Sequence, residues 1–169
     1  MPMSVSVVVG NPKPRSRTWQ AAHLVAEKIA GRPADLSVDL VDFGAALLDW
    51  AEDTVAETIK VVMASDLLVV ASPTYKATYT GLLKLFLDRI SGGALAGVTA
   101  VPLMLGGDWR HSLASDMLLK PVLVELGATC PTRGLFLTEA DFADSPVLEA
   151  WLEVSRPQLR ASLPRSAGP

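Results

Sequence analysis

The chain has 169 residues, half of them hydrophobic and a fifth charged, a composition typical of one globular domain with a substantial core. Its formal net charge of -3 disfavours a general nucleic-acid binder, because such proteins need a basic surface to neutralise phosphates. The single cysteine excludes an intrachain disulfide, and no apolar stretch reaches the roughly 18 residues of a membrane span, so we expect a cytoplasmic protein without membrane contact.

Short apolar runs alternate with amphipathic segments along the chain. The runs at 5–10 and 66–72 are continuous, as is typical of strands covered on both faces, whereas 36–43 alternates as an edge strand does. Pro102 is unfavourable within the fourth expected strand, because proline lacks the N–H that donates a hydrogen bond to a neighbouring strand. We expect strands over residues 5–10, 36–43, 66–72, 97–105 and 128–139. We expect helices over residues 18–31, 55–65, 82–91, 112–127 and 145–161.

Five strand–helix units in a chain of this length predict an α/β fold, with a parallel sheet between two layers of helices. We expect a single domain over residues 1–161 and a flexible tail over residues 162–169. Ligands of such folds bind beyond the carboxyl ends of the strands, where the strand order reverses. The loops after the first, third and fourth strands are therefore the candidates for a functional site.

The first of these loops, in "GNPKPRSRTW" (residues 10–19), is cationic and rich in hydroxyls. Ser16, Arg17 and Thr18 stand where a helix is expected to begin, and the free N–H groups and positive dipole of a helix N-terminus favour an anion. Hydroxyls and an arginine add donors suited to a monophosphate ester. A plain helix cap by Ser16 or Thr18, with solvated arginines, explains the same residues equally well.

The other two loops are compatible with a flat ligand. The turn at residues 73–76 (PTYK) offers backbone donors and an aromatic ring to the edge of a heterocycle, and the glycine pair at 106–107 allows a close backbone approach. Each of them can also be an ordinary surface turn. Three ligand-competent loops at one end of one sheet favour a binding site over three unrelated turns.

Several other chemistries lack their sequence signatures. No G-x-G-x-x-G follows the first strand and no G-x-x-x-x-G-K-[ST] occurs, which disfavours a Rossmann dinucleotide site and a P-loop NTPase. The G-x-S-x-G of a serine hydrolase is absent too. His23, His111 and Cys130 are isolated and lack the spacing of metal ligands, so no metal site is expected.

Three segments resemble the NADPH-dependent FMN reductase family, and most closely the flavin reductases of two-component sulfonate monooxygenase systems. They are "GNPKPRSRT", "SPTYKATYTGLLKLFLD" and "GGDWRHSLASDMLLKPVLVELGA", within a resemblance that runs from about residue 5 to residue 139. The family has a flavodoxin-like fold, which implies a five-stranded parallel sheet in the order 2-1-3-4-5. The resemblance also implies which residues bind FMN: Ser16, Arg17 and Thr18 at its phosphate, Pro73, Thr74, Tyr75 and Lys76 beside its isoalloxazine ring, and Gly106, Gly107 and Asp108 on the other side of that ring.

The resemblance further implies an oxidoreductase that transfers hydride from NADPH or NADH to FMN, without a catalytic acid or base side chain. Such an enzyme supplies reduced flavin to a partner monooxygenase. One alternative is an enzyme of the same fold that keeps FMN bound and reduces a quinone, an azo dye or a metal oxyanion. An electron-transfer flavodoxin is a less favoured interpretation, because the T/S-x-T-G-x-T phosphate loop usual in flavodoxins is absent.

The expected helix over 82–91 bears on assembly. Apolar residues cover most of its surface, and a helix of that kind is buried on more than one side. They are Leu82, Leu83, Leu85, Phe86, Leu87 and Ile90. We therefore expect a subunit interface at this helix, and the family resemblance likewise implies a homodimer or homotetramer.

Overall fold

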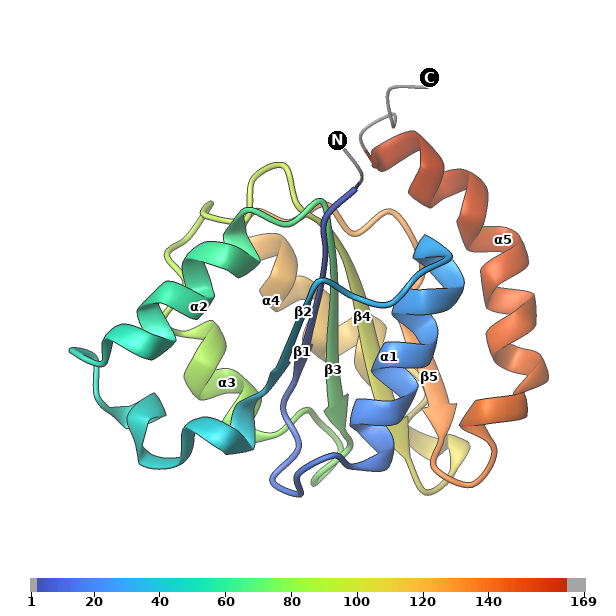
Figure 1. Cartoon of the computed structure of the whole chain (residues 1–169). Helices are drawn as coiled ribbons and strands as arrows, with labels where there is room; N and C mark the ends of the chain where they lie inside the picture. Colours follow the sequence, from blue (N-terminus) through green and yellow to red (C-terminus); the bar gives the residue numbers. More distant parts are fainter. Residues whose placement is uncertain (1–2, 164–169) are drawn as a thin grey trace.

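One five-stranded sheet organises the computed structural model, which describes residues 3–163 (Figure 1). Its strands are parallel and run in the order β2-β1-β3-β4-β5, as predicted. They span Val5–Val9 (β1), Leu36–Asp39 (β2), Leu67–Pro73 (β3), Thr99–Gly106 (β4) and Leu135–Thr138 (β5). The helices span Arg17–Ala30 (α1), Asp53–Met63 (α2), Gly81–Leu87 (α3), Lys120–Glu125 (α4) and Pro146–Ser162 (α5).

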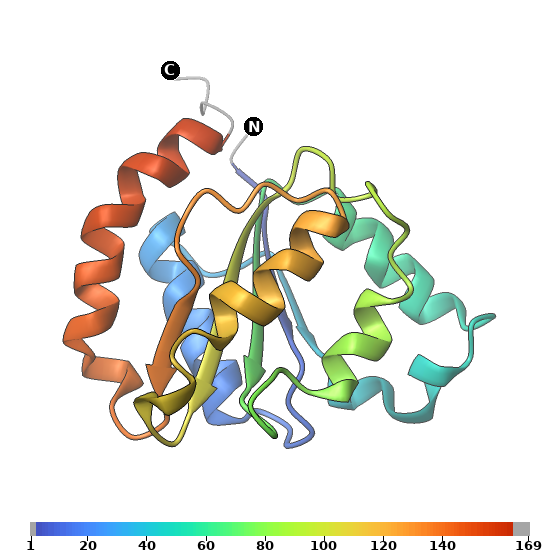
Figure 2. The same ribbon diagram turned by 180° about the vertical axis from the view of Figure 1, so that it is seen from behind.

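Two layers of helices cover the two faces of the sheet, as Figures 1 and 2 show from opposite sides. In β1, Val7 and Val9 belong to the core on the side of α1 and α5, whereas Val8 belongs to the core on the side of α2, α3 and α4. This alternation follows from the period of two along a strand, and it explains why the central strands are apolar on both faces. All described elements build on this one sheet, and a single domain over residues 1–161 stays a prediction.

The second strand lies at the edge of the sheet, as predicted, but it is shorter than the predicted range of 36–43. β2 ends at Asp39, and Leu40–Leu48 form 3-10 turns with a kink at Gly44, where φ is 52°. Leu40 and Leu47 are both buried beneath these turns. The alternation of apolar and polar residues after Asp39 therefore reflects the packing of tight turns on the core, because such turns also bury only some of their side chains.

The last predicted strand, 128–139, is mostly irregular. Only its final residues, as β5, pair continuously with β4, and before them one bridge joins Thr129 to β4. Pro131 lacks an N–H for a ladder, and the Gly134 N–H donates to the Asp116 carboxylate at 2.7 Å. The chain between Thr129 and β5 therefore leaves the sheet and returns.

Pro102 lies within β4, despite its missing N–H. Two residues earlier, the Ala100 N–H donates to the Thr129 carbonyl on the β5 side at 2.8 Å. Backbone groups alternate in direction along a strand, so residue 102 faces that side too. Pairing with β5 begins only at Leu103, so proline at this position leaves no ladder bond unmade.

Most apolar side chains of the predicted 82–91 helix are buried within the chain itself. α3 ends at Leu87. Four of the six apolar residues belong to the same hydrophobic core as Leu40 and Leu47 of the turns at 40–48. The four buried residues are Leu83, Phe86, Leu87 and Ile90. Leu85 is 39% exposed. The helix thus offers less free apolar surface than its sequence suggested, and a subunit interface there stays a prediction.

The predicted helix over 112–127 is divided into two parts. Ser115–Leu119 form a π-helical turn, and α4 follows it directly. Gly134 packs against this turn so closely that a Cβ there would lie 2.5 Å from Ser115 Oγ. The irregular segment before β5 and the turn before α4 therefore hold each other in place.

Two predictions concern the C-terminal tail and the absence of a membrane span. The predicted tail begins with Ser162, the last residue of α5, and residues 164–169 lie outside the described residues. Within residues 3–163, no helix has both the length and the apolar character that crossing a membrane requires.

Candidate functional site

Three loops meet at the carboxyl end of the sheet, as the parallel topology requires. The loop after β1 is joined to the loop after β3, because Thr80 Oγ1 donates to the Gly10 carbonyl at 2.5 Å. The loop after β3 is joined to β4, where the Thr74 N–H donates to the Leu105 carbonyl at 2.6 Å. Gly10 also lies so close to α3 that a Cβ would be 2.4 Å from Leu83 Cβ. The candidate loops therefore form one connected surface.

The loop after β1 places its hydroxyls at the start of α1. Ser16 is the N-cap, and its Oγ accepts a backbone N–H of the first turn at 3.2 Å. Thr18 is buried, and its Oγ1 accepts from the Asn11 amide at 3.0 Å. Each hydroxyl keeps its own hydrogen for a further acceptor, and the Arg17 guanidinium is mostly exposed, 3.6 Å from Glu139. Helix capping and anion binding are therefore compatible at this loop.

Asp39, which no sequence motif marks, holds the same loop in place. Its buried carboxylate accepts from the Arg15 N–H at 2.8 Å and from the Arg15 guanidinium at 2.9 Å. Hydrogen bonds with Asp42 and with Asp39 raise the pKa of Arg15. Arg15 adopts a φ of 49°, in the left-handed region, and its guanidinium lies 5.6 Å from the centroid of the Trp19 ring. Arg15 therefore stabilises the loop itself, which leaves Arg17 as the better placed cation for a ligand.

The loop after β3 is a tight turn with an unusual backbone. Tyr75 and Thr78 exchange backbone hydrogen bonds of 2.8 and 3.2 Å, and between them Lys76 and Ala77 have φ of 51° and 70°. Two-residue turns of this kind favour Asn-Gly, because glycine adopts a positive φ without strain. Tyr75 and Lys76 are both exposed. The turn therefore presents its aromatic ring and its amine outward, away from the core.

We expect Ala77→Gly to raise the free energy of unfolding by about 0.5–1 kcal/mol, because it removes left-handed strain that exceeds the added entropy of the unfolded chain. The melting temperature should rise by about 1–4 °C. Ala150→Gly is the matched control: this exposed alanine lies inside α5, where the same change should destabilise the protein by about 1 kcal/mol. Equal losses in both variants would show that the turn stores no strain.

Gly106 is the last residue of β4 and lies close to the loop after β3. Pro73, the buried last residue of β3, pairs in register with β4. The next residue, Thr74, has a buried Oγ1 without a hydrogen-bond partner among the described residues. A Cβ at Gly106 would lie 3.4 Å from that oxygen and 2.7 Å from Phe136 Cζ, so a larger residue does not fit there. A buried hydroxyl without a partner, beside a glycine, is a candidate donor to a ligand.

Gly107 and Asp108 lie exposed beyond β4. Asp108 caps the short turn Trp109–His111, and its carboxylate accepts from the Arg110 N–H at 2.9 Å and from the Arg110 guanidinium at 3.0 Å. The backbone hydrogen bond is the main reason why the pKa of Asp108 is lowered. The Asp108 side chain is thus engaged with its own turn, and the loop offers a ligand mainly its backbone.

The end of the sheet therefore combines donors for an anion with two loops that can flank a flat ring. Of the predicted positions, Ser16, Arg17 and Thr18 share the first region, and the second region is formed by residues 73–76 and 106–108. Among residues 3–163, no group of three or more His, Cys, Asp or Glu side chains could hold a metal ion. Burial raises the pKa of the Cys130 thiol to about 11, so it is protonated at neutral pH and a poor nucleophile.

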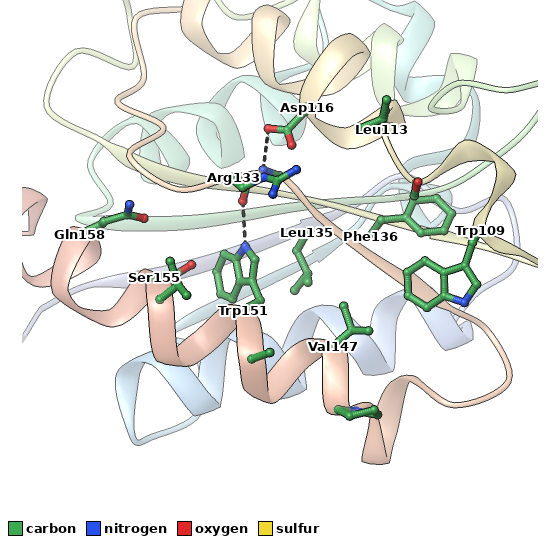
Figure 3. A pocket seen from close by; sticks show the side chains of 15 residues that line it. Trp109, Leu113, Asp116, Arg133, Leu135, Phe136, Val147, Trp151, Ser155 and Gln158 are labelled. Atoms are coloured by element: carbon green, nitrogen blue, oxygen red, sulfur yellow. Dashed lines mark hydrogen bonds between the residues drawn. The ribbon is translucent and has the colours of Figure 1, made fainter.

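A groove of about 620 Å³ lies beside this end of the sheet, along the open edge of β5 (Figure 3). α5 forms one wall, and Ser112, Leu113 and Asp116 contribute to the other. Trp109 lies at the end nearest the glycine loop, and its ring centroid is 5.8 Å from that of Phe136. No sequence motif marks this groove, because its residues come from separate segments that only the fold brings together.

A parallel sheet in this order, with ligand-competent loops at its carboxyl ends, defines a flavodoxin-like protein. Flavodoxin 2 from Bacillus cereus superposes with a TM-score of 0.66, covering 95% of this chain and 99% of that chain, at 16% sequence identity, a likeness that concerns the fold alone. The model of the family "NADPH-dependent FMN reductase" matches residues 3–143. The chain belongs to this family.

Individual relatives agree with the assignment. The FMN reductase (NADPH) of Escherichia coli (strain K12) is 34% identical over 146 residues, 84% of this chain and 76% of that protein. The NADH-dependent FMN reductase SfnF of Pseudomonas putida is 31% identical over 153 residues, 86% of this chain and 82% of that protein. The apo crystal structure of the NADH:FMN oxidoreductase EMOB superposes with a TM-score of 0.85 at 31% identity, covering 98% and 92% of the two chains. The predicted family, fold and class of enzyme are thus confirmed: the chain is a flavodoxin-like oxidoreductase of the FMN reductase family.

Proposed function

We propose that this chain transfers hydride from NADPH or NADH to FMN and supplies the reduced flavin to a partner monooxygenase in the cytoplasm. The observation that carries the proposal is the connected surface of three loops in a chain of this family: it combines free hydroxyl donors and a cation at the start of α1 with a buried, unpartnered hydroxyl at Thr74. The relatives named above are FMN reductases that use NADPH or NADH, and either donor is compatible with this surface.

The start of α1 binds the FMN phosphate in this proposal. Ser16 and Thr18 donate their hydroxyl hydrogens, Arg17 adds a charged donor, and the positive end of the helix dipole favours the dianion. Thr18 is held by Asn11 at 3.0 Å, so its hydroxyl is positioned before the ligand arrives. The buried Asp39–Arg15 pair keeps the surrounding loop in one conformation, which limits the entropy lost on binding.

The isoalloxazine ring lies between the loops at 73–76 and 106–108. Gly106 and Gly107 let the backbone approach the ring, and Thr74 Oγ1 donates to its polar edge. Tyr75 and Lys76 border the ring from their exposed turn. Bound FMN supplies the hydride acceptor. The remaining task of the protein is to stack the nicotinamide on the flavin at contact distance, and this task needs no acid or base side chain.

Two measurements on the purified protein test this proposal. We expect flavin absorbance or fluorescence to change when FMN is titrated into the protein, and we expect NADPH or NADH oxidation to depend on added FMN. Absence of both FMN binding and FMN-dependent oxidation would overturn the proposal. Ping-pong kinetics with tightly retained FMN and a quinone as acceptor would instead support the alternative of an FMN-containing quinone, azo or metal-oxyanion reductase.

We also propose that the chain forms a homodimer or homotetramer. Apolar side chains line the outer surface around the π-helical turn and α4, where a monomer would leave them in water. They are Leu113, Met117, Leu118 and Val124, between 40% and 67% exposed. This surface extends the expected interface beyond α3, whose Leu85 is also exposed.

We expect Met117→Asp to lower the oligomeric state, because it places a charge in the middle of this apolar surface. Light scattering at micromolar concentration measures the mass directly. Thr54→Asp, at an exposed position of α2, is the control and should leave the mass unchanged. A wild-type protein that is monomeric under these conditions would contradict the assembly proposed here.

A further inference from the structure

We propose that the groove along β5 binds the adenosine diphosphate half of the nicotinamide nucleotide, an inference that rests on the proposed FMN reductase function. The groove is separate from the three loops that hold FMN in that function. Nothing in the family assignment places a ligand there.

The groove begins where the flavin site ends. Trp109 lies directly after the glycine loop, and Phe136 connects the groove to the loop because its ring would contact any side chain at Gly106. A donor whose nicotinamide stacks on the flavin must extend its other half over the neighbouring surface. Figure 3 shows that the groove runs from Trp109 past Trp151 to Gln158, beside α5. The dinucleotide therefore has a continuous path from the flavin ring into the groove.

The walls suit an aromatic base. Trp109 is 45% exposed and Val154 is 65% exposed, although both line a concave surface. Trp151 and Val147 line the same groove. Its volume of about 620 Å³ lies within the range of about 300–1,000 Å³ typical of small-molecule sites. An adenine ring would cover apolar side chains that otherwise face water.

The charges in the groove favour an anionic ligand. Arg133 is exposed, and among the described residues its guanidinium has neither an ion pair nor a hydrogen bond. A guanidinium presents parallel donors that match phosphate oxygens. The carboxylate of Asp116 also lines the groove, but it accepts from the Gly134 N–H at 2.7 Å and lies 3.7 Å from Lys120 Nζ. Its charge is therefore compensated, and Arg133 is left as the partner for a pyrophosphate.

The edge of β5 is poorly suited to an added polypeptide strand, the other ligand that such a groove can attract. A strand would need free backbone groups along the edge. The Arg133 carbonyl already accepts from the Trp151 indole at 2.8 Å, and the Gly134 N–H is used by Asp116. The start of the edge is thus capped by side chains, which favours a nucleotide over a peptide.

Two variants test the groove. Arg133→Gln removes the cation, and Ala150→Leu fills the groove from an exposed position of α5. Reduced nicotinamide mononucleotide lacks the adenosine half, so it serves as the matched donor. We expect each variant to lower kcat/KM for NADPH or NADH about tenfold more than kcat/KM for the mononucleotide. The controls are Arg156→Gln and Ala161→Leu, which change exposed residues of α5 outside the groove and should not alter this ratio.

Binding of ADP-ribose, with and without a 2′-phosphate, provides a readout that needs no flavin. Calorimetry should detect binding to the wild-type protein and an affinity at least about tenfold weaker in Ala150→Leu. The groove proposal fails, and the proposed function stands, if three results occur together. FMN-dependent oxidation persists, the groove variants lower kcat/KM equally for the dinucleotide and the mononucleotide, and ADP-ribose does not bind. If ADP-ribose binds in the groove but no oxidation occurs, the proposed function fails. A change of mass in Ala150→Leu, without a change in donor preference, would assign the groove to a second copy and overturn the proposal.

Discussion

Replacement of Arg17 by alanine is expected to raise the dissociation constant of FMN by about tenfold to a hundredfold, with little effect on folding stability. A charge-assisted hydrogen bond to phosphate is worth about 1.5–3 kcal/mol, which corresponds to this range. The Arg17 side chain is 64% exposed, and its closest carboxylate, on Glu139, is 3.6 Å away. Its loss therefore removes little from the unliganded fold. Fluorescence titration with FMN measures the change.

Riboflavin and a second arginine make this test specific. Riboflavin lacks the phosphate, so its affinity should be the same in Arg17→Ala and in the wild-type protein. Arg15→Ala is the contrasting variant: it leaves the buried carboxylate of Asp39 without its cation and should lower the free energy of unfolding. Unchanged FMN affinity in Arg17→Ala, or an equal loss for riboflavin, would remove Arg17 from the phosphate site.

Gly10→Ala is expected to destabilise the protein by about 3 kcal/mol or more, a large part of the stability of a single domain. The added Cβ would lie 2.4 Å from Leu83 Cβ and 2.9 Å from Leu83 Cα, so the backbones of two elements must separate. The same movement would break the hydrogen bond from Thr80 to the Gly10 carbonyl, which joins two of the candidate loops. Urea unfolding, with binding of FMN to the folded protein, measures both effects.

Gly92→Ala is the control for this change. A Cβ there meets no atom of residues 3–163 within 4 Å, and the free energy of unfolding should change by no more than about 0.5 kcal/mol. If Gly10→Ala unfolds at the same urea concentration as Gly92→Ala, the close approach of β1 and α3 does not constrain the residue at position 10.

The parallel sheet and its apolar central strands could be predicted because they depend on local patterns, whereas the strand order was implied by the family resemblance. A strand covered on both faces must be apolar throughout, and β1 and β3 are. The lengths of β2 and β5 could not be predicted in the same way. Alternation at 36–43 fits tight turns as well as a strand, and the departure of the chain around Pro131 depends on contacts with the distant Asp116.

Some residues of the candidate site could likewise be predicted from local patterns, and others depend on distant contacts. Ser16, Arg17 and Thr18 could be placed at the start of a helix because a hydroxyl residue before an amphipathic segment is a local signal of a helix start, and their role at a phosphate stays a prediction. Asp39 could not, because its bond to Arg15 joins positions 24 residues apart and carries no motif. The groove along β5 was likewise beyond sequence patterns, since α5 and residues 112–116 meet only in the folded chain.

The missing N–H of Pro102 also governs what lies on the far side of β5. A chain that continued the ladder past Thr129 would gain no bond from the nitrogen of Pro102, so a detour at this point forgoes one hydrogen bond fewer than it would opposite another residue. The detour brings Arg133 and Gly134 to the turn before α4 and to α5, where Asp116 and Trp151 bind them. One imino acid in the middle of the sheet thus coincides with an edge strand that starts late, and the residues of that late start, Arg133 and Gly134, line the groove.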